Sequence, residues 1–228
     1  MNLQQIIPNL QFKGIKNYKD VAIESLSNNS SDKSISGMYF CLKGGKVDGH
    51  DYAKQAIDNG AVCLVVERFL DLPVTQILVD NARRAMSAIS AIFYEFDKSN
   101  IKFIGVTGTN GKTTTAFVTR HILQNMGKRV GMIGTEGTYI GNIKVPTQLT
   151  TPDPIKLHKI IHDMDKNNIE YVVMEVSAHA IALNKIDSIM YEVVGLTNIT
   201  HFFSNGDVVE FASGTFFVFC VSHCKFLL

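Results

Sequence analysis

The residues best suited to chemistry lie in a glycine-rich segment that reads GVTGTNGKTT from Gly105 to Thr114. Glycines let consecutive backbone N–H groups curve around phosphate oxygens, and the start of a following helix adds partial positive charge. Lys112 would supply a full positive charge to the outer phosphates, and a threonine hydroxyl after it can bind Mg²⁺. The strict phosphate-loop pattern has glycine where Val106 stands, so the match depends on the GKT end and its strand and helix context. The segment predicts a phosphate site, and the alternative is a glycine-rich turn before a core helix.

Glu175 is the second candidate, because it stands near the end of the apolar run YVVMEV. An unpaired carboxylate there would cost on the order of several kcal/mol unless a cation or hydrogen bonds met it. A Mg²⁺ ion held on nucleotide phosphates would satisfy it, whereas the alternative is a glutamate that faces solvent or a lysine. His179 has two interpretations, a structural or exposed histidine and a ligand. Thr150 and Thr151 also have two, a helix cap and a substrate contact.

The elements that must position these residues alternate between strands and helices after about residue 98. The predicted strands are 101–106, 130–133, 171–176 and 193–197. The predicted helices run from 112 to about 126 and over 154–166. Strands that are apolar throughout indicate burial on both faces, hence a mostly parallel sheet covered by helices. Ligands of such sheets gather at the carboxyl ends of the strands, which is where each candidate segment falls.

The residues before this boundary predict a smaller α/β unit. Its predicted strands are 38–42, 61–67 and 76–79, and its predicted helices are 52–60 and Asn81 to about Phe96. Asp80 or Asn81 is expected to cap the second helix. The polar segment 97–100 then marks the expected domain boundary.

Composition excludes several classes of protein. The 228 residues are 46% hydrophobic and 19% charged with five prolines, which is too apolar for a disordered chain. The mean hydropathy of +0.09 is too low for a bundle of membrane helices. Lys plus Arg number 22 against 21 Asp plus Glu, so no basic field attracts nucleic acid or anionic lipid. The first residues carry no secretory signal pattern, and a cytoplasmic location is expected.

Four motifs in this order, GVTGTNGKTTT, LTTPDP, YVVMEVSAHA and LTNIT, resemble the Mur ligases. The earlier run FCLKGGKVDGHDYAKQAIDNGAVCLVVE resembles the uridine-nucleotide-binding domain of the same family, so the resemblance covers about residues 20–200. It implies a UDP-sugar-binding domain over 1–98 and a partial ATP-binding central domain over 99–200. The implied activity is an ATP-dependent ligase that adds the third amino acid to UDP-N-acetylmuramoyl-L-alanyl-D-glutamate in peptidoglycan synthesis, through an acyl phosphate.

The resemblance also implies roles for residues of the phosphate loop. The ATP phosphates would be held by Gly108, Thr109, Asn110, Gly111, Lys112, Thr113 and Thr114. Lys112 would be the phosphate charge and, with Glu175, a catalytic residue. Thr113 or Thr114 would lie near Mg²⁺, with Glu175 as a magnesium ligand.

Substrate contacts follow from the same resemblance. The UDP-muramoyl-peptide would meet Thr150, Thr151, Ser177 and Lys185, of which Lys185 stands where the family has arginine. Lysine keeps the charge and loses the bidentate fork. Ser31 would correspond to the uridine-contacting serine of a D-S-R segment that here reads Ser-Ser-Asp. The uridine nucleotide would also lie along Gly45, Lys46 and Val47. His50 has two interpretations, a contact with this nucleotide and a loop-capping role.

The chain departs from the family after LTNIT. Phe202 and Phe203 stand where the family has Asp and His, and seven of the 14 phenylalanines lie in residues 201–228. We interpret 201–228 as an aberrant tail left by a frameshift, a misassembly or a fragment. The second metal site and the amino-acid-binding domain are then missing, so we expect this polypeptide alone not to complete ligation and its tail to favour aggregation.

Two other functions stay open. The chain is a non-catalytic module that binds ATP or a UDP-sugar, or it is a relative of folylpolyglutamate synthase, which shares the phosphate loop. The N-terminal domain and the MEVSAHA segment argue against the second. A monomer is expected if the chain is soluble, and the sequence does not reveal which amino acid is added.

Overall fold

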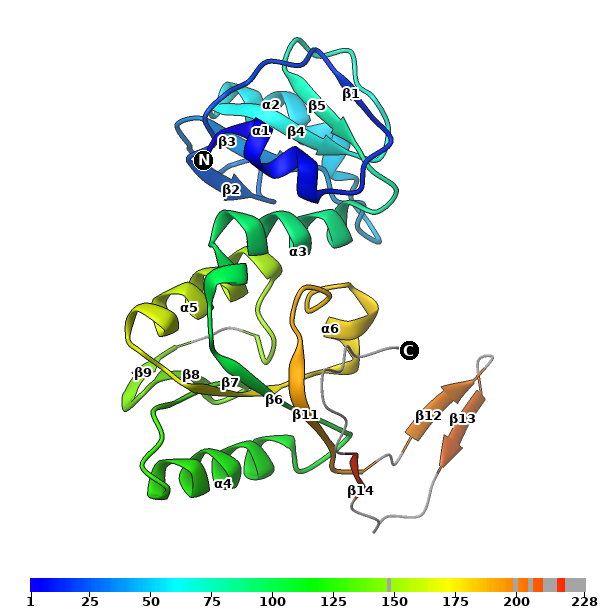
Figure 1. Ribbon diagram of the computed structural model, residues 1–228. Coiled ribbons are helices and arrows are strands. Elements are labelled where there is room, and N and C mark those ends of the chain that lie inside the picture. Colours follow the sequence, from blue (N-terminus) through cyan, green and yellow to red (C-terminus); the bar gives the residue numbers. More distant parts are fainter. Residues whose placement is uncertain (147–148, 199–200, 205–206, 211–216, 220–228) are drawn as a thin grey trace. The chain divides into compact units, whose positions relative to one another are not determined.

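A computed structural model of the chain describes residues 1–146 and 149–198 and, as backbone alone, 201–204, 207–210 and 217–219 (Figure 1). The chain divides into two compact units, Met1–Asp97 and Lys98–Leu228. Each unit builds its own sheet with helices packed on it, and the predicted α/β class is confirmed. The side chains of the phenylalanine-rich tail expected over 201–228 lie outside the described residues.

The first unit contains a five-stranded sheet of order β1-β5-β4-β3-β2. Its strands are β1 (Gly14–Lys16), β2 (Ser25–Ser27), β3 (Gly37–Phe40), β4 (Ala61–Val66) and β5 (Thr75–Leu78). Its helices are α1 (Leu3–Ile6), α2 (Ala53–Asp58) and α3 (Ala82–Phe93), and short 3₁₀ turns cover η1 (Ile7–Asn9), η2 (Gly49–Tyr52) and η3 (Phe96–Lys98). β2 to β5 are parallel, and β1 pairs antiparallel with β5.

Helices cover this sheet because its central strands are apolar on both faces. A cluster on the α2 side contains Tyr39, Cys41, Ala53, Ala56, Ala61, Leu64 and Val66. The helix expected to run to about Phe96 instead ends at Phe93, because Tyr94 leaves the helical region and Glu95 has φ +53°. Its cap is Asn81, whose side chain accepts a hydrogen bond from the Arg84 N–H at 3.0 Å.

The second unit contains a seven-stranded sheet of order β14-β11-β6-β10-β7-β8-β9. Its strands are β6 (Lys102–Thr107), β7 (Val130–Gly134), β8 (Gly137–Ile140), β9 (Ile143–Val145), β10 (Tyr171–Glu175), β11 (Tyr191–Leu196) and β14 (Phe217–Phe219), and β12 (His201–Ser204) pairs separately with β13 (Asp207–Glu210). Its helices are α4 (Lys112–Asn125), α5 (Pro154–Lys166) and α6 (Ala178–Ala182). β11, β6, β10 and β7 are parallel, as predicted, and the hairpin β8–β9 was not predicted.

The helices of this unit lie on opposite faces of its sheet, α4 on one and α5 and α6 on the other (Figure 1). Val130 and Met132 of β7 pack in a cluster with Ala116 of α4. Gly131 faces α5, where an added Cβ would come within 2.9 Å of the Met164 sulfur. Because β11, β6, β10 and β7 are parallel, their carboxyl ends lie at one edge of the sheet, and the candidate residues follow those ends.

Within the described residues, no helix is both long enough and apolar enough to cross a membrane.

Candidate functional site

The glycine-rich loop joins β6 to α4, in the predicted strand, loop and helix context. Gly111 has φ +81° directly before the first helical residue, Lys112, a left-handed conformation that favours glycine. Gly108 has φ +133°, and a Cβ there would overlap the Thr197 hydroxyl and lie 2.8 Å from the Asn198 carbonyl oxygen. Both glycines are thus required by backbone conformation, and Gly108 also by close packing.

The loop is held by the residues that follow β11. Asn198 accepts hydrogen bonds from the N–H groups of Thr109, through its carbonyl at 3.0 Å, and Asn110, through Oδ1 at 3.0 Å. The Thr197 hydroxyl donates to the Asn110 carbonyl at 2.5 Å. The sequence assigned no role to these two residues of the LTNIT run. Here they fix the shape of the phosphate loop, and the amides of Thr109 and Asn110 bind Asn198.

The ammonium of Lys112 lies over its own loop. Its Nζ donates to the carbonyl oxygens of Gly108 at 2.7 Å and Thr109 at 3.0 Å. The first N–H groups of any α-helix lack acceptors within the helix, so those at the start of α4 add donors beside this charge. The arrangement concentrates positive charge at the loop, which suits an anionic ligand.

Glu175, at the end of β10, is fully buried. Its Oε2 accepts from the Thr113 hydroxyl at 2.9 Å and from the Thr135 hydroxyl at 3.2 Å, and its Oε1 accepts from the Thr135 N–H at 3.1 Å. Gly134 permits this position, because a Cβ there would overlap the carboxylate. The carboxylate therefore faces the phosphate loop, and the alternative that it faces solvent or a lysine is wrong.

Thr135 is a site residue that the sequence analysis missed. Besides its two bonds to Glu175, its hydroxyl lies 3.0 Å from the Thr150 hydroxyl. A hydroxyl carries one hydrogen, so when Thr135 donates to Glu175, Thr150 donates to Thr135. Thr135 thus connects a predicted substrate residue to a predicted metal ligand. Its place directly after a parallel strand is the signal that would have found it.

Three other predicted substrate residues lie in two segments, Thr151 before α5, and Ser177 and Lys185 after β10. The Thr151 hydroxyl, which is buried, donates to the Glu175 carbonyl at 3.1 Å and accepts from the Ser177 N–H at 3.4 Å. Ser177 caps α6 by accepting from the Ala180 N–H at 3.2 Å. Buried Lys185 forms an ion pair with Asp153 at 2.7 Å.

The structure decides between the two interpretations of Thr150 and Thr151, a helix cap and a substrate contact, by showing which residue caps α5. Asp153 is the N-cap residue of α5, so the interpretation of Thr150 and Thr151 as caps of that helix is wrong. His179 lies in the first turn of α6 and is exposed. The structure thus brings Thr150, Thr151 and Ser177 to the edge that carries Glu175.

The donor set at Glu175 fits Mg²⁺. A threonine hydroxyl and a carboxylate are hard oxygen ligands, and Thr113 and Glu175 already lie within 2.9 Å of each other. Thr114 is exposed, and the bond to Glu175 comes from Thr113. No group of three or more His, Cys, Asp or Glu side chains within the described residues is arranged to hold a metal. Mg²⁺ typically keeps waters and phosphate oxygens as its other ligands, so one carboxylate suffices.

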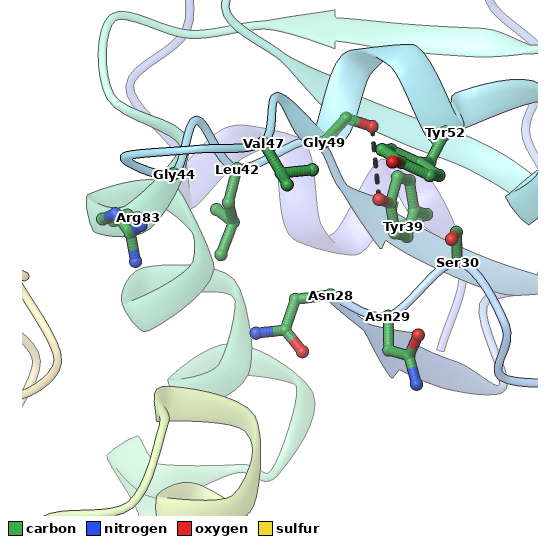
Figure 2. Close-up of a pocket in the computed structure, with 10 residues that line it drawn as sticks. All are labelled: Asn28, Asn29, Ser30, Tyr39, Leu42, Gly44, Val47, Gly49, Tyr52 and Arg83. Atoms are coloured by element: carbon green, nitrogen blue, oxygen red, sulfur yellow. Dashed lines mark hydrogen bonds between the residues drawn. The ribbon is translucent and has the colours of Figure 1, made fainter.

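A pocket of about 330 Å³ lies in the first unit (Figure 2). It is lined by Asn28, Asn29, Ser30, Tyr39, Leu42, Gly44, Val47, Gly49, Tyr52 and Arg83. Val47 is thus the predicted nucleotide residue that lines it. Gly45 and Lys46 form an exposed turn closed by a 2.8 Å bond from the Gly44 N–H to the Val47 carbonyl. Ser31 is exposed and follows the lining residue Ser30.

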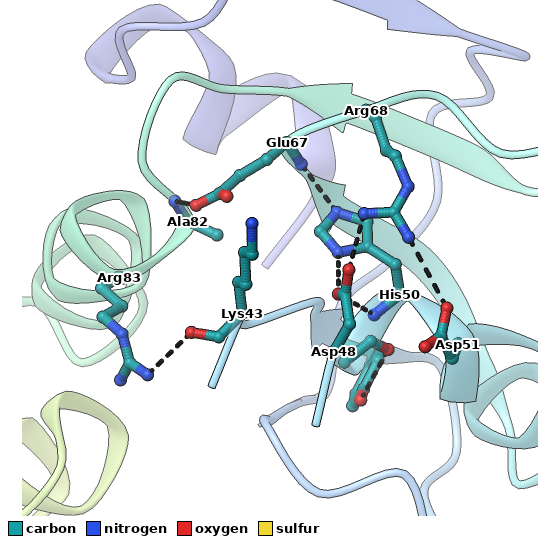
Figure 3. Close-up of polar contacts among 10 residues, drawn as sticks. Lys43, Asp48, His50, Asp51, Glu67, Arg68, Ala82 and Arg83 are labelled. Atoms are coloured by element: carbon teal, nitrogen blue, oxygen red, sulfur yellow. Dashed lines mark hydrogen bonds and ion pairs between the residues drawn. The ribbon is translucent and has the colours of Figure 1, made fainter. Parts of the chain in front are cut away.

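Asp48 belongs to the pocket-lining loop 44–49, and hydrogen bonds to His50 and Arg68 hold its side chain in place (Figure 3). Buried His50 accepts the Glu67 N–H at Nε2, at 2.9 Å, so its hydrogen is on Nδ1, which donates to Asp48 at 2.6 Å. Arg68 binds the other oxygen of Asp48 at 2.7 Å. The His50 backbone N–H, assisted by the Arg68 and His50 side chains, holds the pKa of Asp48 well below its usual range. His50 is not among the ten lining residues, which favours the loop-capping role.

Two family models match the chain in the same order as its two units. One described as "Mur ligase family, catalytic domain" matches residues 23–96, and one described as "Mur ligase middle domain" matches residues 106–202. The chain belongs to the Mur ligase family. The pocket lies in the first matched region of this Mur ligase chain, and the phosphate loop and Glu175 lie in the second.

Relatives among the Mur ligases are longer than this chain. The UDP-N-acetylmuramoyl-L-alanyl-D-glutamate–2,6-diaminopimelate ligase of Clostridium botulinum (strain ATCC 19397 / Type A) is 38% identical over 205 residues, which cover 88% of this chain and 42% of that protein. A solved structure of a ligase with the same name matches with a TM-score of 0.67 at 22% identity, over 85% of this chain and 38% of that one. The MurF ligase from Thermotoga maritima in complex with ADP matches with a TM-score of 0.52 at 23% identity, over 76% and 37%. The structures show a shared fold.

Proposed function

We propose that this chain carries the ATP-binding and UDP-precursor-binding parts of a ligase that adds the third amino acid to UDP-N-acetylmuramoyl-L-alanyl-D-glutamate in peptidoglycan synthesis. The names of its relatives support this reaction, with 2,6-diaminopimelate as the added amino acid. The observation that carries the proposal is the chain of contacts from Thr113 through Glu175 and Thr135 to Thr150. It joins a phosphate loop to the residues expected to bind the acceptor substrate.

In this proposal the ATP phosphates lie on the loop from Gly108 to Thr114. Lys112 leaves its loop carbonyls for the outer phosphates and stabilises the charge that spreads over the transferring phosphoryl group. Thr113 and Glu175 hold Mg²⁺, which supplies neutralising charge to the phosphates when it is bound. The protein's own contribution is position and electrostatics, as in other phosphoryl transfers.

The acceptor substrate lies, in this proposal, along Thr150, Thr151, Ser177 and Lys185. A carboxylate of the substrate would replace Asp153 as the partner of the Lys185 ammonium. The terminal carboxylate of the dipeptide attacks the γ-phosphorus, and the bond to ADP breaks. The incoming amine then attacks the acyl carbon, an amide forms, and inorganic phosphate leaves with the electron pair of the broken C–O bond.

The UDP end of the precursor is assigned to the first unit. Ser31, Gly45, Lys46 and Val47 are the residues that we expect along the uridine nucleotide, at the rim of the 330 Å³ pocket. Residues 1–98 then form the precursor-binding domain and 99–200 the ATP-binding domain. A cytoplasmic location and a monomeric state remain part of the proposal.

Calorimetry with the full chain tests the binding steps. We expect Mg²⁺ with a non-hydrolysable ATP analogue, and separately UDP-N-acetylmuramoyl-L-alanyl-D-glutamate, to bind wild type. Lys112→Ala should abolish binding of the ATP analogue and keep binding of the precursor. Lys156→Ala is the matched control, because Lys156 is exposed on α5. Failure of wild type to bind either ligand would contradict the proposal.

Phosphate release with ATP, the precursor and 2,6-diaminopimelate tests turnover. Release that requires all three substrates would contradict the expectation that this polypeptide alone does not complete ligation. Binding of both ligands without release would restrict the chain to the binding steps.

A further inference from the structure

One charged side chain lines the pocket of the first unit. Of its ten lining residues, Arg83 is charged, and the others are tyrosine, asparagine, serine, glycine, valine or leucine. Figure 2 shows Arg83 and Gly44 at one end of the pocket and Ser30, Asn29 and Tyr52 at the other. The pocket therefore has an aromatic and amide end, suited to a flat polar ring, and a cationic end, suited to an anion.

The guanidinium of Arg83 has donors to spare. It donates one hydrogen bond, from Nη2 to the Lys43 carbonyl at 3.2 Å, and a guanidinium has five N–H donors. Within the described residues it forms no ion pair, whereas Arg68 pairs with both Asp48 and Asp51. Arg83 is thus a half-buried cation held at the pocket with its charge uncompensated.

Helix stability does not explain this position. Arg83 is the second residue of α3, whose first turn has no acidic residue, and a cation near a helix N-terminus is unfavourable. The first N–H of the helix, that of Ala82, already donates to the Glu67 carboxylate at 2.9 Å, so the guanidinium is the group left to bind an anion at this end. In the free protein Arg83 therefore keeps one hydrogen bond, to the Lys43 carbonyl, and it gains an ionic partner when an anion binds.

We propose that Arg83 binds the diphosphate of the UDP-linked precursor, with the nucleoside at the end formed by Ser30, Tyr39 and Tyr52. The inference deepens the proposed function and rests on it. Asp32 stands here where the D-S-R segment of the family has arginine. It accepts hydrogen bonds from the Ser27 hydroxyl and the Asn29 side-chain amide. Asp32 is not among the lining residues, and it is a carboxylate where the family has a cation, so the positive charge for the diphosphate comes from Arg83 of α3.

Comparison of UDP with uridine tests the inference, because the two ligands differ only by the diphosphate. Titration calorimetry uses the full chain as wild type, Arg83→Gln and Arg83→Lys, with Arg84→Gln as the control, since Arg84 is exposed and does not line the pocket. We expect Arg83→Gln to weaken UDP about 10- to 100-fold, the range of a charge-assisted hydrogen bond pair, and uridine less than about threefold. Arg83→Lys should recover part of the loss, and Arg84→Gln should change neither affinity.

Equal changes for UDP and uridine in Arg83→Gln would overturn the inference, as would no change in either. Lys46→Gln provides a rival cation at the exposed turn beside the pocket. Loss of UDP binding in Lys46→Gln with none in Arg83→Gln would assign the diphosphate to Lys46 instead. A wild type that binds neither UDP nor uridine would contradict the proposed function of the pocket, a result distinct from an Arg83 variant that binds both normally.

Discussion

Thr113 and Glu175 meet through a hydrogen bond of 2.9 Å between Oγ1 and Oε2, although they are 62 residues apart in the chain. One belongs to the first turn of α4 and the other to the end of β10. This contact brings a phosphate-loop hydroxyl to a buried carboxylate, which is the arrangement that an Mg²⁺ ion on nucleotide phosphates needs.

Thr113→Val removes one of the three hydrogen bonds that satisfy the Glu175 carboxylate. Because Glu175 is fully buried, we expect the free energy of unfolding to fall by about 1–3 kcal/mol. Thr114→Val makes the same chemical change at an exposed position and should cost less than about 0.5 kcal/mol. Urea denaturation followed by circular dichroism measures both. Equal losses in the two variants would contradict the role of the Thr113 bond.

Thr135→Val keeps the Thr135 backbone N–H on Glu175 and removes the hydroxyl bridge to Thr150. We expect it to weaken the UDP-muramoyl-dipeptide by roughly threefold to tenfold, the range of one net hydrogen bond. Thr135→Ser should restore most of the affinity, because the serine hydroxyl keeps both partners. In a double-mutant cycle with Thr150→Val, the unfolding free energies should be non-additive, since the two hydroxyls contact each other. Additive losses would show that the bridge has no energetic effect.

Asp48→Asn tests the hydrogen bonds that hold the Asp48 side chain in the pocket-lining loop. The pKa of Asp48 is held well below its usual range, first by the His50 backbone N–H, so the ionised carboxylate stabilises the folded chain above the unfolded pKa of about 4. That stabilisation is lost as pH falls below about 4 toward the folded pKa. Thermal unfolding should show a constant deficit in the variant from pH 8 to about pH 5, which shrinks at lower pH. Asp51→Asn is the control, because the exposed side chain of Asp51 lies 3.6 Å from Arg68, beyond the distance of a hydrogen bond. A deficit that grows on acidification would contradict the assignment.

His158→Gln tests the acid sensitivity of the second unit. Burial lowers the pKa of His158 to about 3, and its Nε2 lies 2.6 Å from the Ser188 hydroxyl. Since the unfolded chain binds this proton below about pH 6.5 and the folded chain does not, His158 destabilises by about 1.4 kcal/mol for each pH unit below that value. The wild type should therefore lose more stability than His158→Gln between pH 6.5 and pH 5 in urea denaturation. Exposed His121→Gln should follow the wild type, and parallel slopes for all three proteins would refute the prediction.

The parallel strands and the phosphate loop were accessible from sequence because local pattern determines them. Strands β6, β7 and β10 are apolar on both faces. In the loop, the two positions with positive φ are occupied by glycines, Gly108 and Gly111, which the sequence shows directly. The hairpin β8–β9 was missed because β9 is short and entirely exposed, so it lacks a hydrophobic pattern. Length and burial of a strand thus decide whether its sequence predicts it.

The partners of the predicted residues were not accessible, because they depend on strand order. Thr135 reaches Glu175 since β7 is the neighbour of β10, and Asn198 reaches Thr109 since β11 is the neighbour of β6. No local pattern encodes those adjacencies. Arg83 was missed for a related reason, since the helix periodicity that predicts α3 does not show which other loops line a pocket beside it.

The bonds from Thr109 and Asn110 to Asn198 also bear on how the protein is made. The Asn110 N–H and the Asn198 side chain are 88 residues apart in sequence, so this contact forms only after a long loop has closed. A nascent chain on the ribosome has synthesised the whole phosphate loop well before residue 198 emerges to fix it. The fixed shape of the glycine-rich loop is therefore a late property of this unit, and it reports that β11 has taken its place beside β6.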